Sequence, residues 1–272
     1  MKILIYIVLI LIPLSQLYLL SLMGRGGNPE FEKFKKCRYA HRGLHKKPSI
    51  PENSLNAFSD AVKAGFGIEL DVHLMADGKL AVIHDSSLLR TAGADVKIEN
   101  LTETDLKKYY LEGTRSKIPT LSQVLKKVGG KVPLLIELKS EGNTAPLCEA
   151  VVKELEGYKG DYMIESFDPR CIAWFRKNCP EVVRGQLVEN FFKDKQSNIS
   201  FFLKLILSPL ILNVWAQPDF VAIKFSDRKG LSNKIARRYW KLGGFVWTID
   251  KAEDLETAEK EGYGVIFENI EI

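Results

Sequence analysis

The chain has 272 residues, of which 46% are hydrophobic and 27% charged, and its net charge is +5. These values exclude a disordered or fibrous protein and describe an ordinary globular one. Lys and Arg mostly alternate with Glu and Asp, as over residues 99–108 and 251–260. Such mixed charge is typical of solvated helix faces and argues against a nucleic-acid partner.

The amino terminus differs from the rest of the chain, because residues 3–23 are uncharged and rich in Ile and Leu. At about 1.5 Å per residue, a helix of this length covers a bilayer core of roughly 30 Å, so we predict a single-pass transmembrane anchor over residues 1–24. The alternative is a cleaved signal peptide, but Ser-Leu-Met-Gly at 21–24 is a poor cleavage site. Residues 25–36 follow as a Gly-rich linker, and the basic residues after the span predict a cytoplasmic globular domain.

From residue 37 to 272 short apolar runs alternate with amphipathic stretches such as 54–64, 121–128, 147–156 and 254–261. The runs are predicted strands at 38–41, 67–72, 133–138, 162–166, 182–187, 220–225, 244–249 and 264–267. Regular alternation of strand and helix predicts an α/β fold, a (β/α)₈ TIM barrel. An open doubly wound sheet is the alternative.

One further apolar run, at residues 80–83, follows the second strand too closely for a crossover helix. Asp77-Gly78 lies midway between the two runs, and such a pair predicts a two-residue hairpin turn. In that register Asp71 lies directly opposite His84, with Cβ atoms about 5 Å apart. Glu69 shares the face of Asp71, because side chains alternate along a strand. We therefore predict a hairpin excursion after the second strand that brings two carboxylates beside a histidine.

Other reactive side chains end the neighbouring strands. His41 ends the first strand, and Glu137 and Lys139 end the third. The carboxyl ends of barrel strands meet at one rim, where barrel active sites lie, so these groups should join Glu69 and Asp71 there. The three carboxylates are hard oxygen donors, which suit Mg²⁺ or Ca²⁺ better than zinc.

The remaining polar groups of this cluster indicate chemistry on an anionic substrate. His41 and His84 are not needed as metal ligands, so they can transfer protons near neutral pH. Arg42 and Lys139 add the positive charge that a phosphate needs. Of the other histidines, His45 is predicted to be solvated beside two lysines, and His73, on the face of Asp71, to lie at most behind the site.

A series of short motifs runs in order from about residue 37 to the carboxyl terminus. They are His41-Arg42-Gly43, Pro51-Glu52-Asn53-Ser54, Glu69-Leu70-Asp71-Val72, His84-Asp85, Ile118-Pro119-Thr120-Leu121, Glu137-Leu138-Lys139, Ser166-Phe167 and Trp247-Thr248. This ordered series resembles that of the glycerophosphodiester phosphodiesterases. The resemblance implies a barrel enzyme that uses a divalent cation to hydrolyse glycerophosphodiesters to glycerol 3-phosphate and an alcohol.

The resemblance also implies a role for each matching residue. His41 and His84 would be the acid–base pair, and the metal ligands would be the three carboxylates already named. Substrate binding would fall to Arg42 and Lys139 at the phosphate and to Trp247 at the glycerol. Residues 266–269, Ile-Phe-Glu-Asn, depart from the Thr-Asp-x-Pro ending that is common in the family, which puts substrate choice in question.

A second apolar region, residues 191–215, has no evident catalytic task. It is too short and interrupted to span a membrane, so we expect either a buried helix or a segment that rests in the bilayer interface. An interfacial segment would suit a lipid-derived substrate. Two alternatives to the phosphodiesterase therefore stay open: a lysophospholipase D that acts on membrane lysolipids, and a catalytically idle barrel that binds phosphate or lipid.

Overall fold

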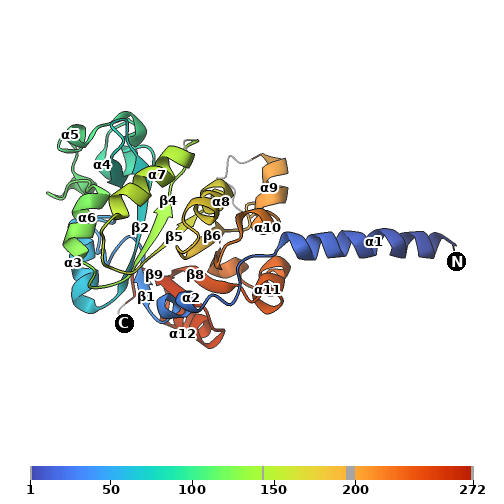
Figure 1. The fold of residues 1–272 in the computed structure, drawn as a ribbon. Helices are drawn as coiled ribbons and strands as arrows, with labels where there is room; N and C mark the ends of the chain where they lie inside the picture. The colour runs from blue at the N-terminus through green and yellow to red at the C-terminus, as the bar shows by residue number, and fades with distance from the viewer. Residues whose placement is uncertain (1, 143, 194–199, 271–272) are drawn as a thin grey trace.

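The computed structural model describes residues 2–142, 144–193 and 200–270, and its centre is a closed barrel (Figure 1). The strands form one nine-stranded sheet in the order β1-β9-β8-β7-β6-β5-β4-β2-β3, and β1 also pairs with β2. This second pairing closes the sheet, which confirms the barrel and rules out the open alternative. The parallel strands are β1 (Arg38–Ala40), β2 (Gly67–Leu74), β4 (Leu134–Leu138), β5 (Tyr162–Ser166), β6 (Arg184–Val188), β7 (Phe220–Lys224), β8 (Gly243–Ile249) and β9 (Gly264–Phe267).

Helices surround the barrel, and their ends carry clear local signals. Ser54 caps the first of them by accepting a hydrogen bond from the N–H of Ala57, and Gly65 ends it in the left-handed region with φ of +77°. The surrounding helices are α3 (Leu55–Ala64), α6 (Leu121–Val128), α7 (Thr144–Leu155), α8 (Pro169–Asn178), α11 (Leu231–Arg238) and α12 (Ala252–Lys260). Shorter elements are α9 (Phe201–Leu207), α10 (Asn213–Ala216) and η3 (Phe225–Asp227).

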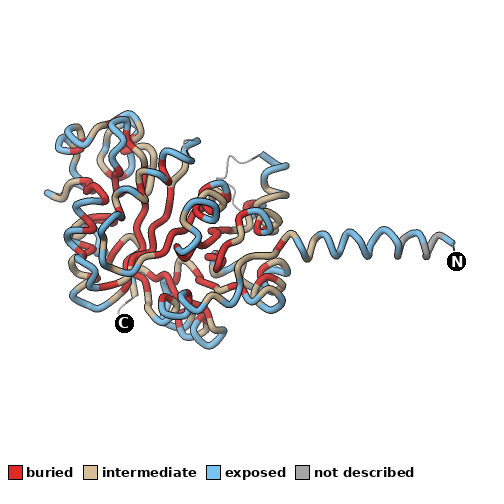
Figure 2. The backbone as a smooth tube through the Cα atoms, viewed as in Figure 1, coloured by how far each residue is buried: buried red, intermediate tan, exposed pale blue. Residues whose placement is uncertain are grey.

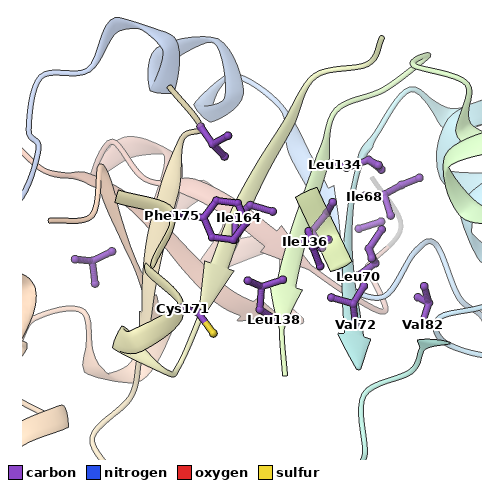
Figure 3. Packing of buried hydrophobic residues seen from close by; sticks show 14 of the residues in the cluster. Ile68, Leu70, Val72, Val82, Leu134, Ile136, Leu138, Ile164, Cys171 and Phe175 are labelled. Carbon is purple, nitrogen blue, oxygen red and sulfur yellow. The ribbon is translucent and has the colours of Figure 1, made fainter. Parts of the chain in front are cut away.

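The alternation of side chains along each strand divides the core into two layers. Figure 2 shows that the strands at the centre of the molecule are largely buried. Ile68, Leu70 and Val72 of β2 point outward and pack in the cluster beneath the helices, part of which Figure 3 shows. The residues between them, Glu69 and Asp71, belong to the opposite face of β2, which lines the barrel interior. Because β2 is buried on both faces, its inward side chains Glu69 and Asp71 lie inside the barrel.

Residues 25–36, which we predicted to be a linker, contain a helix that closes the barrel floor. This helix, α2 (Pro29–Lys35), is capped by the Asn28 side chain and buries Phe31 and Phe34. The Phe31 ring stacks on Phe220 at 5.2 Å between centroids and meets Phe245 edge-on at 5.7 Å. The segment is therefore part of the barrel core, because its two aromatic side chains fill the interior below the site.

The first helix, α1 (Lys2–Ser21), extends away from the barrel but is joined to it at its last turn (Figure 1). The Tyr18 hydroxyl lies 2.8 Å from Ser232 Oγ, and Trp240 Nε1 donates to the Leu19 carbonyl at 2.8 Å. Leu22 just after the helix is fully buried. Across the described residues, no helix combines the length and the hydropathy needed to cross a bilayer. The structure therefore does not support the transmembrane anchor that we predicted for residues 1–24.

The hairpin excursion is present, but its register differs by one residue from our prediction. Between β2 and β3 (Leu80–Val82) the N–H of Met75 donates to the Lys79 carbonyl at 2.9 Å. The turn that this bond closes holds three residues, 76–78, and Gly78 takes a φ of +76°. A three-residue turn with glycine in the left-handed region is the common alternative to the two-residue turn that we expected. Asp71 consequently faces Ile83, whose N–H donates to its carbonyl at 3.0 Å, and not His84.

Beyond β3 the chain forms a small satellite lobe before it returns to the barrel. The elements of the lobe are α4 (Leu89–Ala92), η1 (Ile98–Asn100), α5 (Glu103–Leu106) and η2 (Leu111–Gly113). The lobe has its own apolar cluster, which includes Met75, Ile83, Leu88 and Ile98. Because this cluster holds Ile83 in place, it also fixes the position from which His84 leaves the strand.

Candidate functional site

Three carboxylates meet at the carboxyl ends of β2 and β4. Parallel pairing places Asp71 beside Glu137 in the register, and Glu69 lies two residues earlier on the same face of β2. All three are buried, and a ligand oxygen from each lies within 4.8 Å of the other two. The convergence that we expected from strand parity is therefore present in the structure.

The charges around these carboxylates are arranged to hold them close together. Burial, with Asp71 and Glu137 nearby, raises the pKa of Glu69 well above its usual value. Burial alone would also raise the pKa of Asp71, but Lys139 and other cations nearby hold it well below its ordinary range. Lys139 Nζ lies 3.0 Å from Asp71 Oδ1 and 2.6 Å from Glu137 Oε1, and Asn53 Nδ2 donates to Asp71 Oδ2 at 2.8 Å.

This donor set fits a divalent cation. All the ligand atoms of the cluster are carboxylate oxygens, which hard ions such as Mg²⁺ and Ca²⁺ prefer. Burial and then the nearby carboxylates Asp71 and Glu137 raise the pKa of Glu69, and a bound cation would offset the repulsion between these carboxylates. Glu69 is also held in a fixed position, since its Oε2 accepts the backbone N–H of Arg42 at 2.8 Å.

His41 lies just beyond β1 with one ring nitrogen on a carboxylate and the other near the cluster. Its Nδ1 is 2.7 Å from Glu268 Oε2, and its Nε2 is 3.9 Å from Glu69 Oε2. Burial lowers the pKa of His41, although the hydrogen bond to Glu268 opposes this change. The ring is therefore held in one orientation and favours the neutral form.

His84 is supported by a chain of ion pairs. Its Nδ1 lies 2.6 Å from Asp85 Oδ1. Arg90 donates from Nε to Asp85 and from its two terminal nitrogens to Glu52. Glu52 Oε1 in turn accepts from Arg42 Nη1 at 2.8 Å. Arg42, His84 and the groups between them are consequently linked into one network.

The two histidines without a predicted catalytic role also contact the site. His73 is buried, with Nε2 at 3.0 Å from the carbonyl oxygen of His84 and Nδ1 at 2.8 Å from Glu99 Oε1. It lies behind the site, as we expected. His45 was predicted to be solvated, but its side chain is only 5% exposed and its Nε2 lies 3.5 Å from Glu268 Oε2.

One cavity of about 530 Å³ unites most of the predicted residues. Its lining includes His41, Arg42, Glu69, His84, Glu137, Lys139 and Trp247. Asp71 contacts Lys139 just behind this surface. The Trp247 ring meets Phe167 edge-on at 5.7 Å and forms an apolar part of the wall.

Among the acidic residues near the site that our prediction did not include are Asp85, Glu165 and Glu268. Glu165 pairs with Glu137 in the strand register and lines the cavity. Burial and then Glu137 raise its pKa well above the usual value. The period-two alternation of β5 could have identified Glu165, since it lies two residues before Phe167 on the same face.

Comparison with known proteins places the chain in a family. The glycerophosphoryl diester phosphodiesterase family matches residues 41–271. A glycerophosphodiester phosphodiesterase of Caldanaerobacter subterraneus is 30% identical over 244 residues, which cover 85% of this chain and 93% of that protein. This chain belongs to the glycerophosphoryl diester phosphodiesterase family. A second relative of the same name, from Bacillus altitudinis, is 36% identical over 156 residues, or 53% of this chain and 63% of that protein.

The barrel itself matches solved structures of this family. A phosphodiesterase of Oleispira antarctica, determined in complex with its product sn-glycerol-3-phosphate, superposes with a TM-score of 0.72 at 22% identity. The match covers 87% of this chain and 94% of that one. A glycerophosphodiester phosphodiesterase of Thermotoga maritima gives a TM-score of 0.65 at 27% identity, over 85% of this chain and 93% of that one. The fold is thus that of glycerophosphodiester phosphodiesterases.

Proposed function

We propose that this chain hydrolyses glycerophosphodiesters to glycerol 3-phosphate and an alcohol, with a divalent cation held by Glu69, Asp71 and Glu137. The observation that carries the proposal is the position of the three carboxylates in one cavity with two histidines that are each backed by a carboxylate. Family membership supports the reaction class.

The cation, Mg²⁺ or Ca²⁺, would polarise a phosphoryl oxygen and offset negative charge on the phosphate. Arg42 and Lys139 line the same cavity, so both can contribute positive charge to a bound phosphate. The apolar wall formed by Trp247 and Phe167 would lie against the carbon atoms of the glycerol group.

The two histidines supply the proton transfers. One imidazole accepts the proton of a glycerol hydroxyl as its oxygen bonds to phosphorus, and the other donates a proton to the oxygen of the departing alcohol. The products of this step are the free alcohol and a cyclic phosphodiester. Water then opens the ring with the two proton transfers reversed, so that each histidine regains its first state and no protein side chain becomes bonded to phosphorus.

The test is turnover of glycerophosphocholine and glycerophosphoethanolamine by chelator-treated protein, with Mg²⁺ or Ca²⁺ added back. Wild type should recover activity with at least one cation, whereas His41→Ala and Glu69→Ala should lose it by about 100-fold or more. Glu259→Ala is a matched control, because this exposed carboxylate pairs with Arg38 on the outer surface. Equal activity in all variants would exclude the assigned site, and no turnover by wild type would favour the idle binding barrel.

A second candidate substrate is a lysophospholipid, and one cavity favours it. A groove of about 760 Å³ is lined by Glu137 and Lys139 together with apolar side chains of the α9–α10 segment. These side chains are Leu203, Leu207, Leu212 and Trp215. An apolar groove beside the carboxylates has room for an acyl chain, so we propose lysophospholipase D activity as the alternative. Faster turnover of lysophosphatidylcholine than of glycerophosphocholine would select it.

We propose in addition that the described parts of residues 191–215, which are 191–193 and 200–215, rest against a lipid surface; residues 194–199 lie outside the described residues. None of the residues of α9 is buried, and Phe201 and Phe202 are 63% and 76% exposed. Exposed aromatic side chains of this kind favour the interface between lipid and water. Sedimentation of the full chain with phosphatidylglycerol vesicles tests this contact, and equal sedimentation of wild type and a Phe201→Ser, Phe202→Ser double variant would exclude it.

A further inference from the structure

Two groups without a predicted role lie behind His41: Glu268 and His45. Glu268 Oε2 is 2.7 Å from His41 Nδ1 and 3.5 Å from His45 Nε2. The side chain of His45 is 5% exposed and that of Glu268 is 29% exposed. Neither is among the described residues that line the cavity, whereas His41 is. The pair therefore contacts His41 from outside the space that the substrate would fill.

Strand geometry fixes this contact from both sides. β1 and β9 are parallel neighbours whose register pairs Ala40 with Phe267, so His41 and Glu268 follow as the next pair. The N–H of His41 donates to the Phe267 carbonyl at 2.9 Å, and the N–H of Glu268 donates to the Ile249 carbonyl at 3.0 Å. Both backbones are thus held by neighbouring strands, and the contact does not depend on a free loop.

We propose that Glu268 is the positioning residue of His41 and that His45 holds the Glu268 carboxylate in place. Glu268 accepts the Nδ1–H of His41, which leaves the Nε2 lone pair free toward Glu69 and the substrate. His41 would then enter the first step as the proton acceptor. This role rests on the proposed hydrolysis of glycerophosphodiesters.

The substitution Glu268→Gln should change the tautomer of the His41 ring. Wild-type Glu268 is an acceptor only, so it selects the tautomer with hydrogen on Nδ1. The amide of Glu268→Gln can donate to Nδ1 and thereby select the tautomer with hydrogen on Nε2, which cannot accept a proton from the substrate. Glu268→Asp keeps the acceptor and shortens the side chain by one methylene, so it should restore the wild-type tautomer.

The experiment combines ¹H–¹⁵N spectra of the histidine rings with steady-state kinetics on glycerophosphocholine. The chain has four histidines, and the resonances of His41 are assigned from a His41→Asn sample. We expect the Nδ1–H tautomer in wild type and Glu268→Asp and the Nε2–H tautomer in Glu268→Gln. The kcat of Glu268→Gln should fall on the order of 100-fold with KM within about twofold, and that of Glu268→Asp by less than about tenfold. Glu259→Gln, an exposed carboxylate on α12, serves as control.

Two results would overturn the proposal. One is an Nε2–H tautomer for His41 in the wild-type protein, and the other is a Glu268→Gln kcat within twofold of wild type. If Glu268→Gln does not fold, the wild-type and Glu268→Asp spectra still decide the matter. Absence of any turnover by wild type would contradict the proposed function alone, because the tautomer is measured independently of activity.

Discussion

The carboxylate cluster should make the cation-free protein less stable than a variant with one charge fewer. The perturbation is Glu69→Gln, which removes a buried negative charge while the amide oxygen can still accept the N–H of Arg42. At 4.8 Å, the distance within which all the ligand oxygens of the cluster lie, two carboxylates repel by about 3.5 kcal/mol at an effective dielectric constant of about 20. Lys139 offsets part of this repulsion, so we expect a net gain of about 1 to 3 kcal/mol in the free energy of unfolding.

The effect has a defined dependence on pH. Burial and the neighbouring carboxylates raise the pKa of Glu69 in the folded state above its unfolded value of about 4.3. The stability that the protonated Glu69 carboxyl group contributes is therefore fully present below the pKa of the unfolded state. It is lost as the pH rises through the pKa of the folded state. The stability advantage of Glu69→Gln should accordingly be small near pH 4 and grow toward pH 8.

The assay is thermal unfolding of wild type and Glu69→Gln in EDTA across this pH range, then with Mg²⁺ or Ca²⁺ in excess. In EDTA at pH 8, Tm should be about 2 to 5 °C higher for the variant. A cation at about 100 times its Kd should stabilise wild type by about 2.7 kcal/mol and the variant by clearly less. A lower Tm for Glu69→Gln in EDTA at pH 8 would refute this account of repulsion, and an equal cation response would exclude Glu69 as a ligand.

Three further predictions concern the barrel interior, the support of the site and the proposed lipid contact. A Cβ at Gly185 would lie 2.1 Å from the Phe220 ring, so Gly185→Ala should lower the free energy of unfolding in urea by about 1 to 3 kcal/mol; full stability of the variant would contradict the packing. His73→Asn should lower kcat about tenfold with little change in KM, because the His84 carbonyl loses its partner; an unchanged kcat would dismiss this support. Phe202→Ser should weaken vesicle sedimentation without changing Tm, since the side chain is 76% exposed; a large drop in Tm would mean that it is buried.

The barrel could be predicted because its signals are local. Each parallel strand is a short apolar run, and the capping residues at Ser54 and Thr120 begin the helices that follow two of the runs. The segment 25–36 was harder, although Asn28 and Pro29 are good signals for the start of a helix. The helix closes the barrel floor because Phe31 packs against the rings of Phe220 and Phe245, which lie about two hundred residues away. This packing cannot be inferred from the segment itself.

The amino-terminal helix shows the opposite limit. Hydropathy favoured a transmembrane anchor over a cleaved signal peptide for residues 1–24, because residues 3–23 form a long uncharged run. Hydropathy does not reveal that the last turn lies against α11 and the following loop through Tyr18 and Leu19. Tertiary contacts of this kind are invisible to a sliding average over one segment.

The prediction of the candidate site depended more on which face of a strand each side chain occupies than on the register between strands. The hairpin register was wrong by one residue, yet His84 still lines the cavity, because β3 ends at Val82 and the chain bends at the histidine. Glu69 and Asp71 were unaffected, since parity on β2 does not depend on the hairpin turn. The register of β1 with β9, which are neighbours because the barrel is closed, places Glu268 beside His41. Glu268 could therefore be identified only with that register, and the burial of His45 could not be inferred from the sequence.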